Sequence, residues 1–502
     1  MNVLTLLEMA ATGMPGRVGV GRLKPAEAAP VRLTYPALLN RARCGAGLLV
    51  ARDAEELVYV GVNADDFAVA LFAAAWAGVP LVPLNYRLSR DALESLLAHH
   101  PNALVISDVQ PPTTAPVVTV GQWRAACAEP ADEPSPWSDD PEAVAVLLYT
   151  SGTTSEPKAA VLRHRHLVSY LLGSVDFGAA REQEAVIVSV PPYHIAGVSN
   201  LLSNVCAGRR VVYLGTFTAQ GWLECVRAEA VTHALLVPTM LAKITEYLGG
   251  SNADVPTLKS LAYGGAKMPI PVLEQAIRLF PGVDFVNAYG LTETSSTIAV
   301  LGPDDHRAAL LGDPIARARL GSAGRLLPGI EVQVRGPGGS LPTGAAGDIY
   351  VRGPQVSGEY RGVGSVLDED GWFATRDRGR VDEDGYLFVE GRTDDTIIRG
   401  GENVAPAEIE DVLLEHPAVA EAAVVGIPDD HWGQDIAAAV VLRPGHTAPP
   451  EELRQWARNR LRGSKTPALI VIRDALPHTS TGKVLRRELL ADLLATEQTA
   501  TL

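Results

Sequence analysis

A loop rich in glycine and hydroxyl side chains follows a strongly apolar segment near residue 150. It reads Leu147-Leu-Tyr-Thr-Ser-Gly-Thr-Thr-Ser-Glu-Pro-Lys158. Backbone N–H groups, hydroxyls and an ammonium group all donate hydrogen bonds to phosphate oxygens. The common nucleotide loop G-x-x-x-x-G-K-[ST] is not matched, because Pro157 replaces its second glycine and Ala159 follows the lysine. We therefore expect a phosphate-binding loop of another kind than that of kinases and P-loop ATPases. The alternative is a polar surface turn.

Four further motifs follow in order along the chain. They read Asn287-Ala-Tyr-Gly-Leu-Thr-Glu293, Gly371-Trp-Phe-Ala-Thr-Arg-Asp377, Gly391-Arg-Thr-Asp394 and Thr481-Gly-Lys483. Together with the loop, they resemble the adenylate-forming superfamily of acyl-CoA synthetases, nonribosomal adenylation domains and firefly-type luciferases, and acyl- and aryl-CoA ligases most closely. Taken singly, each motif has an ordinary alternative, such as a loop ion pair or a core tyrosine. The resemblance extends over nearly the whole chain through Pro83-Leu-Asn85, Gly264-Gly-Ala266, Gly321-Ser-Ala-Gly324, Pro328-Gly329 and Asn403-Val-Ala-Pro-Ala-Glu-Ile-Glu410.

The resemblance implies an ATP site and assigns a role to each motif. The loop would hold the β- and γ-phosphates, Tyr289 would stack on adenine, and Asp377 would accept hydrogen bonds from the ribose hydroxyls with help from Arg392. The residues expected to bind ATP are Thr150, Ser151, Gly152, Thr153, Thr154, Lys158, Asn287, Ala288, Tyr289, Asp377 and Arg392.

The resemblance also implies a catalytic set. Glu293 would hold Mg²⁺, a hard cation that prefers carboxylate and phosphate oxygens, and Thr292 would bind the α-phosphate. Lys483 would bridge the acyl carboxylate and the α-phosphate, where negative charge builds up. The expected catalytic residues are Lys483, Thr292, Glu293 and His194.

Several positions depart from the family pattern. Ser155 and Ala159 stand where glycine is usual in and after the loop, Arg376 replaces a glycine before Asp377, and His478 stands where arginine is frequent. If the Ser155 position needs a positive φ, a serine there costs about 1 kcal/mol. These departures keep a non-catalytic acyl- or nucleotide-binding protein open as an alternative.

The segment Pro191-Pro-Tyr-His-Ile-Ala-Gly197 resembles the substrate motif of acyl- and aryl-CoA ligases, in which the histidine lies between the acyl pocket and the thiol tunnel. A core histidine is the alternative for His194. No aspartate occurs between Pro191 and Asn200, and a buried ammonium without a carboxylate is costly, so an amino acid is disfavoured as substrate. We expect an apolar aliphatic, cyclic or aromatic acid. The expected acyl- and thiol-site residues are His194, Ile195, Val198, Thr239, Met240, Tyr263, Gly264, Gly265 and Gly401.

The family performs two half-reactions by rotating a small C-terminal domain. Asp394 occupies the hinge position and Gly401 the position that lines the thiol tunnel, although a glycine pair is also ordinary in a hairpin. CoA is the expected acceptor, because ligases that load carrier proteins usually carry an insertion. A carrier-protein phosphopantetheine is the alternative, and a luciferase-type oxygenase would share only the adenylation step.

The predicted fold is α/β, with a large N-terminal domain of parallel-sheet layers and a small mobile α+β domain. A chain of 502 residues exceeds one ordinary core, and we place the domains at residues 1–393 and 394–502. Strand patterns at 58–62, 143–148, 186–190 and 211–214 alternate with helical ones such as 89–100. The C-terminal patterns predict helices at 406–415 and 451–461 and strands at 419–425 and 436–442.

Composition restricts partners and location. A net charge of -15 disfavours nucleic acid as ligand. The four cysteines have no metal-ligand spacing and are too few for a disulfide scaffold. The first residues do not read as a cationic stretch followed by a short apolar run, so a secretory signal is not expected. The apolar segment 67–84 contains Gly78, Pro80 and Pro83, which favours a buried helix and strand over a membrane span. We expect a cytoplasmic enzyme that uses ATP, Mg²⁺ and CoA, with a homodimer left open.

Overall fold

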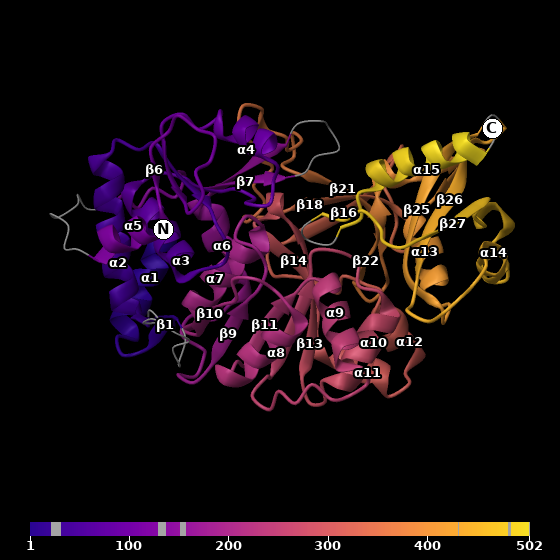
Figure 1. Cartoon of the computed structure of the whole chain (residues 1–502), viewed down its shortest axis with the longest axis horizontal. Helices are drawn as coiled ribbons and strands as arrows, with labels where there is room; N and C mark the ends of the chain where they lie inside the picture. Colours follow the sequence, from indigo (N-terminus) through magenta and orange to yellow (C-terminus); the bar gives the residue numbers. More distant parts are fainter. Residues whose placement is uncertain (22–31, 129–136, 151–156, 430, 480–482, 501–502) are drawn as a thin grey trace.

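Sheets flanked by helices form the N-terminal part of the chain, and a smaller sheet with its own helices forms the C-terminal part (Figure 1). The computed structural model describes residues 1–21, 32–128, 137–150, 157–429, 431–479 and 483–500. The helices are α1 (Val3–Gly13), α2 (Tyr35–Ala51), α3 (Asp65–Ala77), α4 (Arg90–Leu97), α5 (Val120–Ala128), α6 (His164–Ser174), α7 (Ile195–Ala207), α8 (Ala219–Ala228), α9 (Pro238–Leu248), α10 (Ile270–Leu279), α11 (Pro303–Leu310), α12 (Pro314–Arg319), α13 (Pro406–Leu414), α14 (Pro450–Arg458) and α15 (Arg486–Ala500).

The largest sheet has nine strands. Its central strands pair in parallel from β10 through β9, β11 and β12 to β13, and β14 and β15 continue it antiparallel. The carboxyl ends of β9, β11, β12 and β13 therefore meet at one edge. The order is β15 (Arg325–Leu326), β14 (Ser296–Leu301), β13 (Asp284–Leu291), β12 (Ser260–Gly264), β11 (His233–Leu236), β9 (Ala185–Val188), β10 (Arg210–Tyr213), β1 (Val18–Val20) and β2 (Leu33–Thr34).

The described residues form three further sheets. The eight-stranded one is β20 (Gly364–Ser365), β19 (Glu359–Tyr360), β8 (Lys158–Arg163), β7 (Val144–Thr150), β4 (Leu81–Pro83), β3 (Glu56–Val60), β5 (Ala103–Ser107) and β6 (Val117–Val118). A five-stranded antiparallel sheet is β17 (Gly339–Ser340), β16 (Glu331–Gly336), β18 (Gly347–Arg352), β21 (Phe373–Val381) and β22 (Leu387–Arg392). The C-terminal sheet is β24 (Glu402–Val404), β23 (Ile397–Arg399), β26 (Gly433–Leu442), β25 (Val419–Asp429) and β27 (Leu469–Arg473).

The strand and helix predictions from sequence are confirmed, with boundaries shifted by a few residues. The predicted helix at 89–100 is α4, where the Ser89 hydroxyl accepts a hydrogen bond from the Ala92 amide at 3.3 Å. The predicted C-terminal elements are α13, β25, β26 and α14. The apolar segment 67–84 forms most of α3 and then β4, both buried. Among the described residues, no helix has the length and apolarity to cross a membrane.

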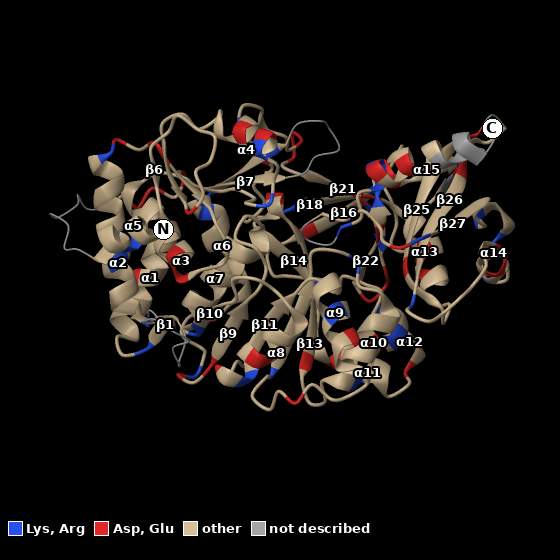
Figure 2. Cartoon of the chain, viewed as in Figure 1, with Lys and Arg blue, Asp and Glu red and all other residues tan. Residues whose placement is uncertain are grey.

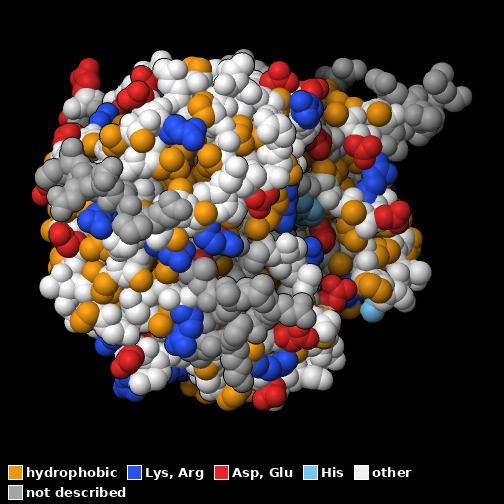
Figure 3. Space-filling view, turned by 60° about the vertical axis from the view of Figure 1, so that its left-hand side comes forward, with side chains coloured by type: hydrophobic (Ala, Val, Ile, Leu, Met, Phe, Trp, Pro, Cys, Tyr) orange, Lys and Arg blue, Asp and Glu red, His pale blue; other side chains and the backbone are white. Residues whose placement is uncertain are grey.

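Apolar clusters lie on both faces of the nine-stranded sheet. One joins it to the eight-stranded sheet through α1, α3 and α7, and the other packs it against α8, α9 and α10. All four cysteines are free and buried. Charged residues lie mainly on helices and connecting loops, while the central strands are mostly uncharged (Figure 2). On the face shown in Figure 3, acidic and basic side chains are interspersed.

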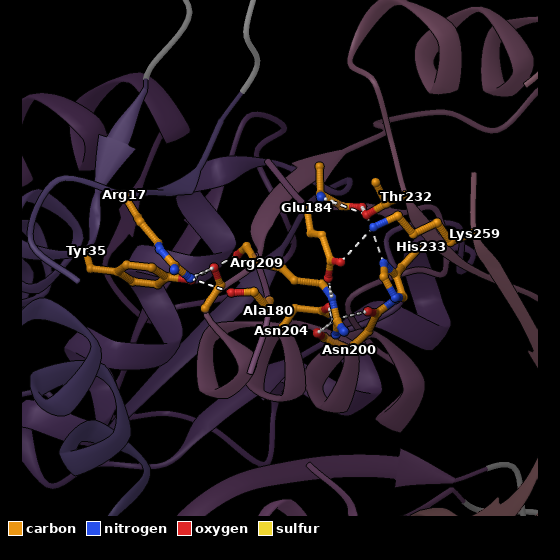
Figure 4. A network of polar contacts seen from close by, with 12 residues as sticks. Arg17, Tyr35, Ala180, Glu184, Asn200, Asn204, Arg209, Thr232, His233 and Lys259 are labelled. Atoms are coloured by element: carbon orange, nitrogen blue, oxygen red, sulfur yellow. Dashed lines mark hydrogen bonds and ion pairs between the residues drawn. The ribbon is translucent and has the colours of Figure 1, made fainter. Parts of the chain in front are cut away.

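The amino ends of β9 to β12 carry a polar network (Figure 4). Glu184 accepts hydrogen bonds from Lys259 Nζ at 2.9 Å and from Arg209 Nε at 3.2 Å, so it ties together three strand starts. The Tyr35 hydroxyl donates to the Arg209 carbonyl oxygen at 2.9 Å. This edge is held together by pairs among the protein's own groups. The opposite edge, at the carboxyl ends, carries the motif residues.

Candidate active site

The carboxyl edge of the nine-stranded sheet gathers the expected acyl-site residues. His194 follows β9 and precedes α7, Thr239 and Met240 follow β11 in the first turn of α9, and Gly264 ends β12. Ligands of open α/β sheets bind outside the carboxyl ends of the strands. Segments far apart in the sequence thus meet at the place where this fold class binds its ligands.

Two glycines are required by close backbone approach at this edge. A Cβ on Gly264 would lie 2.2 Å from the Ala288 carbonyl oxygen, and a Cβ on Gly197 would lie 2.5 Å from that of Pro191. Real Cβ atoms essentially never come this close to backbone. Any side chain at either position would displace the strand or the helix that positions the site.

A buried carboxylate, Asp377, anchors the expected ribose and adenine residues. The Tyr289 hydroxyl donates to its Oδ2 at 2.6 Å, and Arg392 lies 3.2 Å from its Oδ1. Asp377 and Arg392 face each other in the register of β21 and β22, and the Asp377 amide donates to the Thr375 hydroxyl at 3.1 Å. Asp377 is only 5% exposed. Burial and then the Asp377 charge raise the pKa of Tyr289 well above its usual value, so it stays a neutral donor.

Glu293 lies in the short 3₁₀ turn Thr292–Thr294 after β13 and is buried. Its Oε1 accepts a hydrogen bond from the Tyr360 hydroxyl at 2.6 Å. Lys158 Nζ lies 5.9 Å from the centre of the Tyr360 ring. The strand after the loop and the turn after β13 therefore share one wall, in which an ammonium and a carboxylate flank a tyrosine.

Lys483, from the C-terminal part, lies among these N-terminal groups. The residue as a whole is exposed, yet desolvation by the surrounding protein, followed by the Arg392 charge, lowers the pKa of its ammonium group. The charges of Asp377 and Glu293 act on it in the opposite direction. A lysine within the field of all three groups is placed to act on charge that develops between them.

His194, at the start of α7, is also within reach of the Lys483 charge. Burial, and then the Lys483 charge, lower the pKa of its imidazole to about 3, so the ring is neutral at neutral pH. Its Nε2 is buried and has no hydrogen-bond partner among the described residues. A neutral ring can line an apolar pocket and still offer one polar atom to a ligand.

Some expected residues lie elsewhere than predicted. Tyr263 is fully buried beneath α11, with its hydroxyl 2.9 Å from His306 Nε2, because strand alternation directs it to the face away from α7. Val198 is likewise fully buried, on the face of α7 that joins the two large sheets. The prediction that these two side chains line the acyl pocket is wrong in this structure. Ile195 is partly exposed at the start of α7.

Other predictions meet the structure in part. The Asn287 amide donates to the Ser322 carbonyl oxygen at 2.9 Å and so helps to hold β13 in place, with Ala288 next to it. Thr150 and Lys158 pair across β7 and β8. Gly265 has a φ of +82° directly after β12. The predicted phosphate-binding residues Ser151, Gly152, Thr153 and Thr154, and the variant position Ser155, lie outside the described residues.

Two adjacent glycines form the turn of the C-terminal hairpin. Gly400 and Gly401 join β23 to β24 with φ angles of +58° and +83°, as a two-residue turn with both central residues at positive φ requires. The hairpin alternative therefore accounts for both glycines. A role of Gly401 in lining the thiol tunnel stays a prediction.

Arg376 has an unusual backbone conformation for its size. Its φ is +60°, in the region that favours glycine, and its guanidinium lies 4.0 Å from the carboxylate of Asp394. We expect Arg376→Gly to be more stable than Arg376→Ala by about 1 kcal/mol, because both variants lack the guanidinium but only alanine keeps the Cβ that opposes this φ. Reversible denaturant unfolding measures the difference, and equal stabilities would show that the backbone stores no strain here.

Sequence reasoning missed two contributors to the site. Tyr360 donates to Glu293 from 67 residues away in the sequence, and Thr375 holds both the amide of Asp377 and, through its carbonyl oxygen, Arg392. Tyr360 lies in the short strand β19 and belongs to none of the motifs described above, so no local pattern in the sequence indicates its role. Thr375 lies two residues before Asp377 on the same face of β21, so strand alternation could have indicated it.

Comparison with known proteins identifies the family. The profile of AMP-binding enzymes matches residues 7–361, and that of the AMP-binding enzyme C-terminal domain matches residues 408–483. The chain therefore belongs to the AMP-binding, adenylate-forming enzyme family. It is an AMP-forming ligase that joins an acid to a thiol, and the predicted family, fold class and enzyme class are confirmed.

Relatives within the family act on different acids. A feruloyl-CoA synthase of Amycolatopsis is 35% identical, over 91% of this chain and 93% of the relative. A fatty acid–[acyl-carrier-protein] ligase of Streptomyces coeruleorubidus is 34% identical, over 87% of this chain and 86% of the relative. The solved o-succinylbenzoate CoA synthetase of Bacillus subtilis, in complex with its acyl-adenylate intermediate, has a TM-score of 0.83 at 29% identity and covers 96% of this chain and 97% of its own.

Proposed function

We propose that this ligase activates an apolar, ring-containing carboxylic acid with ATP and transfers the acyl group to CoA in the cytoplasm. The convergence of Lys483 with His194 on one side and with Asp377 and Glu293 on the other carries the proposal. The first group stands at the acyl end and the others at the nucleotide end. A lysine between them lies where the acid and the α-phosphate must meet.

The first half-reaction uses this arrangement directly. A carboxylate oxygen of the acid attacks the α-phosphorus of ATP, the bond to the β-phosphate oxygen breaks, and pyrophosphate leaves. Lys483 neutralises the charge that the acid and the α-phosphate bring together. Asp377 accepts from the ribose hydroxyls, while Tyr289 and Arg392 keep its carboxylate fixed.

Glu293 fits a magnesium-binding role. A carboxylate is the kind of ligand that Mg²⁺ takes together with substrate phosphates, and the hydrogen bond from Tyr360 fixes its orientation. When bound, Mg²⁺ would neutralise the phosphate oxygens of the leaving group. A solved structure of the Bacillus subtilis o-succinylbenzoate synthetase, 28% identical with a TM-score of 0.83, holds ATP and a magnesium ion, which supports this assignment.

The walls of the acyl side support an apolar acid. On the face of the nine-stranded sheet that looks toward α7, Leu235, Ala262 and Ala288 are only partly buried, although they lie in central strands. Small and aliphatic side chains beside a neutral His194 suit a flat hydrocarbon group better than an ionic one. Three relatives are named for ferulic, indoleacetic and succinylbenzoic acids, and each of these acids contains a ring.

A carrier-protein phosphopantetheine is the second candidate acceptor. The observation that favours it is the similarity to the fatty acid–[acyl-carrier-protein] ligase, which aligns over 461 residues. That alignment covers 87% of this chain and 86% of the carrier-protein ligase, so the two proteins share most of their length.

A panel of carboxylic acids tests the function. The purified protein is incubated with ATP, Mg²⁺ and fatty, cyclic, phenylpropanoid or other aryl acids, and pyrophosphate is measured with CoA, with a phosphopantetheinylated carrier protein, or with neither. We expect ring-containing acids to give the highest turnover and CoA to accelerate it. Turnover only with carrier protein would reassign the acceptor, and no release with any acid would overturn the proposal.

We further propose that the two half-reactions alternate by rotation at Asp394, which lies in the short turn Thr393–Asp395 between β22 and β23. In the present arrangement, Lys267 and Asp411 form an ion pair at 2.6 Å between the segment before α10 and α13. This exposed pair would separate when Lys483 leaves the site and Gly401 takes its place.

Asp394→Pro is expected to uncouple the half-reactions. Proline fixes its own φ and restricts Thr393, so pyrophosphate exchange should be largely retained while thioester formation falls. Asp394→Ala is the control, because it removes the same carboxylate without restricting the backbone, and it should keep both activities. Equal damage to both steps in the proline variant would contradict alternation about this residue.

A further inference from the structure

A polar cluster outside the reacting groups lies beside the end of β7, and its central members, Glu56 and His100, are buried. We call it the His100 cluster: Glu56, His100, Tyr149 and Arg361. His100 lies between a Glu56 carboxylate oxygen at its Nδ1 and the Tyr149 hydroxyl at 2.9 Å from its Nε2. Arg361 donates to the other Glu56 oxygen at 2.5 Å. Four polar side chains from distant segments are thus linked by consecutive hydrogen bonds.

The bonding pattern fixes the histidine ring. An ionised carboxylate only accepts hydrogen bonds, so Nδ1 donates to Glu56, and Nε2 pairs with the Tyr149 hydroxyl. Both ring nitrogens are engaged, and His100 is only 1% exposed. Burial, ahead of the neighbouring charges, raises the pKa of Tyr149 to about 12, so its hydroxyl remains a donor. The ring therefore transmits the position of Glu56 to Tyr149.

The cluster touches the phosphate end of the ATP site from two sides. Tyr149 directly precedes Thr150 at the end of β7, and Thr150 pairs with Lys158. Arg361 follows Tyr360, which donates to Glu293, and the Arg361 amide donates to the Ala159 carbonyl oxygen at 2.9 Å. Displacing the cluster would move both the strand ends and the tyrosine that orients Glu293.

A cluster with buried charged groups contributes little net stability compared with an apolar core. Burying charged groups costs free energy that their pairing often only balances, and apolar side chains of similar size commonly stabilise a protein as well or better. A charged, fully bonded cluster instead specifies one geometry. Its place beside the phosphate end accounts for that specificity better than stability alone.

We infer that Glu56, His100, Tyr149 and Arg361 are positioning residues for ATP. They hold the ends of β7 and β8 and the Tyr360 side chain in the geometry that binds the phosphates, and they touch neither the acid nor the thiol. The inference rests on the proposed adenylation function. It goes beyond that function by predicting that damage to the cluster weakens ATP use selectively.

Tyr149→Phe tests this with the smallest change, because it removes only the hydroxyl. In acid-dependent pyrophosphate exchange, we expect the KM for ATP to rise about 3- to 10-fold, the size of one hydrogen bond expressed as an equilibrium constant. The KM for the acid and thioester formation from synthetic acyl-adenylate and CoA should stay at wild-type values. Tyr35→Phe is the matched control, since it also removes a buried hydroxyl that donates a hydrogen bond, in the network at the amino ends of the nine-stranded sheet (Figure 4). It should lower stability without changing the KM for ATP.

Arg361 offers a second variant that should fold readily, because its side chain is 42% exposed. Arg361→Met should raise the KM for ATP in the same way, and Arg361→Lys should restore part of the loss by keeping a charge next to Glu56. An unchanged KM for ATP in both Tyr149→Phe and Arg361→Met, or equal damage to the ATP and acid parameters, would overturn the inference. Absence of exchange in the wild-type protein would instead overturn the proposed function.

Discussion

Replacing Lys483 with alanine is expected to lower acyl-adenylate formation by about 10²-fold or more, the usual loss when one well-placed electrostatic donor is removed. Lys483 lies in the field of Arg392, Asp377 and Glu293, and its charge reaches His194 on the acyl side. It is thus placed to bridge the acid and the α-phosphate. Acid-dependent pyrophosphate exchange with a fixed acid measures the loss.

The same variant should keep the second half-reaction. Given synthetic acyl-adenylate and CoA, Lys483→Ala should form thioester at close to the wild-type rate, because in that step the thiol attacks the acyl carbon and AMP leaves, with no attack on the α-phosphorus. Lys465→Ala is the control: this C-terminal lysine pairs with Glu408 at 2.6 Å and should leave both half-reactions intact. If Lys483→Ala damaged both steps equally, a fixed site would be favoured over alternation.

The site residues that could be predicted from the sequence are those that belong to short, contiguous motifs. Tyr289 and Glu293 belong to one such motif, and Asp377 and Arg392 to two others that come to face each other in β21 and β22. Strand and helix positions followed from hydrophobic patterns, because buried parallel strands and amphipathic helices leave strong periodic signals. The class of fold, and the motif residues that meet around Asp377, are therefore predictable from the amino-acid sequence alone.

The errors and omissions arise where geometry depends on which face a residue presents or on distant pairing. Tyr263 precedes the required Gly264, yet alternation along β12 turns its ring to the other face of the sheet. The positive φ of Arg376 could be suspected only from the resemblance to the superfamily, whose pattern has a glycine at this position. The His100 cluster joins β3, β7 and the segment after β19. No local sequence pattern predicts contacts between residues so far apart in the sequence.

Both ends of the site depend on the arrangement of the C-terminal part. Lys483 reaches His194 only because the C-terminal sheet packs near β22, with α13 against that strand. Arg486, close after Lys483, pairs with Glu410 at 2.6 Å and with Asp395 at 3.3 Å. These pairs tie the segment that carries Lys483 to α13 and to the turn that contains Asp394, so the proposed rotation at the turn would move Lys483 as part of a unit.

Replacing Asp377 with alanine should produce the second large loss, and one specific to the ribose. Removal of the carboxylate takes away the proposed acceptor for the ribose hydroxyls and leaves Tyr289 and Arg392 without their common partner. Removing one partner from a buried, charged set of hydrogen bonds costs about 2 kcal/mol or more of binding free energy. This corresponds to a fall in kcat/KM for ATP of about 30-fold or more. Pyrophosphate exchange at varied ATP concentrations measures it.

Deoxynucleotides make the test of Asp377 sharper than activity alone. The wild-type enzyme should prefer ATP to 2′-deoxy-ATP and 3′-deoxy-ATP, because Asp377 bonds both hydroxyls in the proposed site, and Asp377→Ala should use all three nucleotides almost equally. Asp66→Ala provides a matched loss of a buried aspartate paired with an arginine, since Asp66 on α3 accepts hydrogen bonds from Arg124. It should destabilise the protein and keep the preference for ATP. A preference that survives in Asp377→Ala would show that another group reads the ribose and that Asp377 serves only to hold Tyr289 and Arg392.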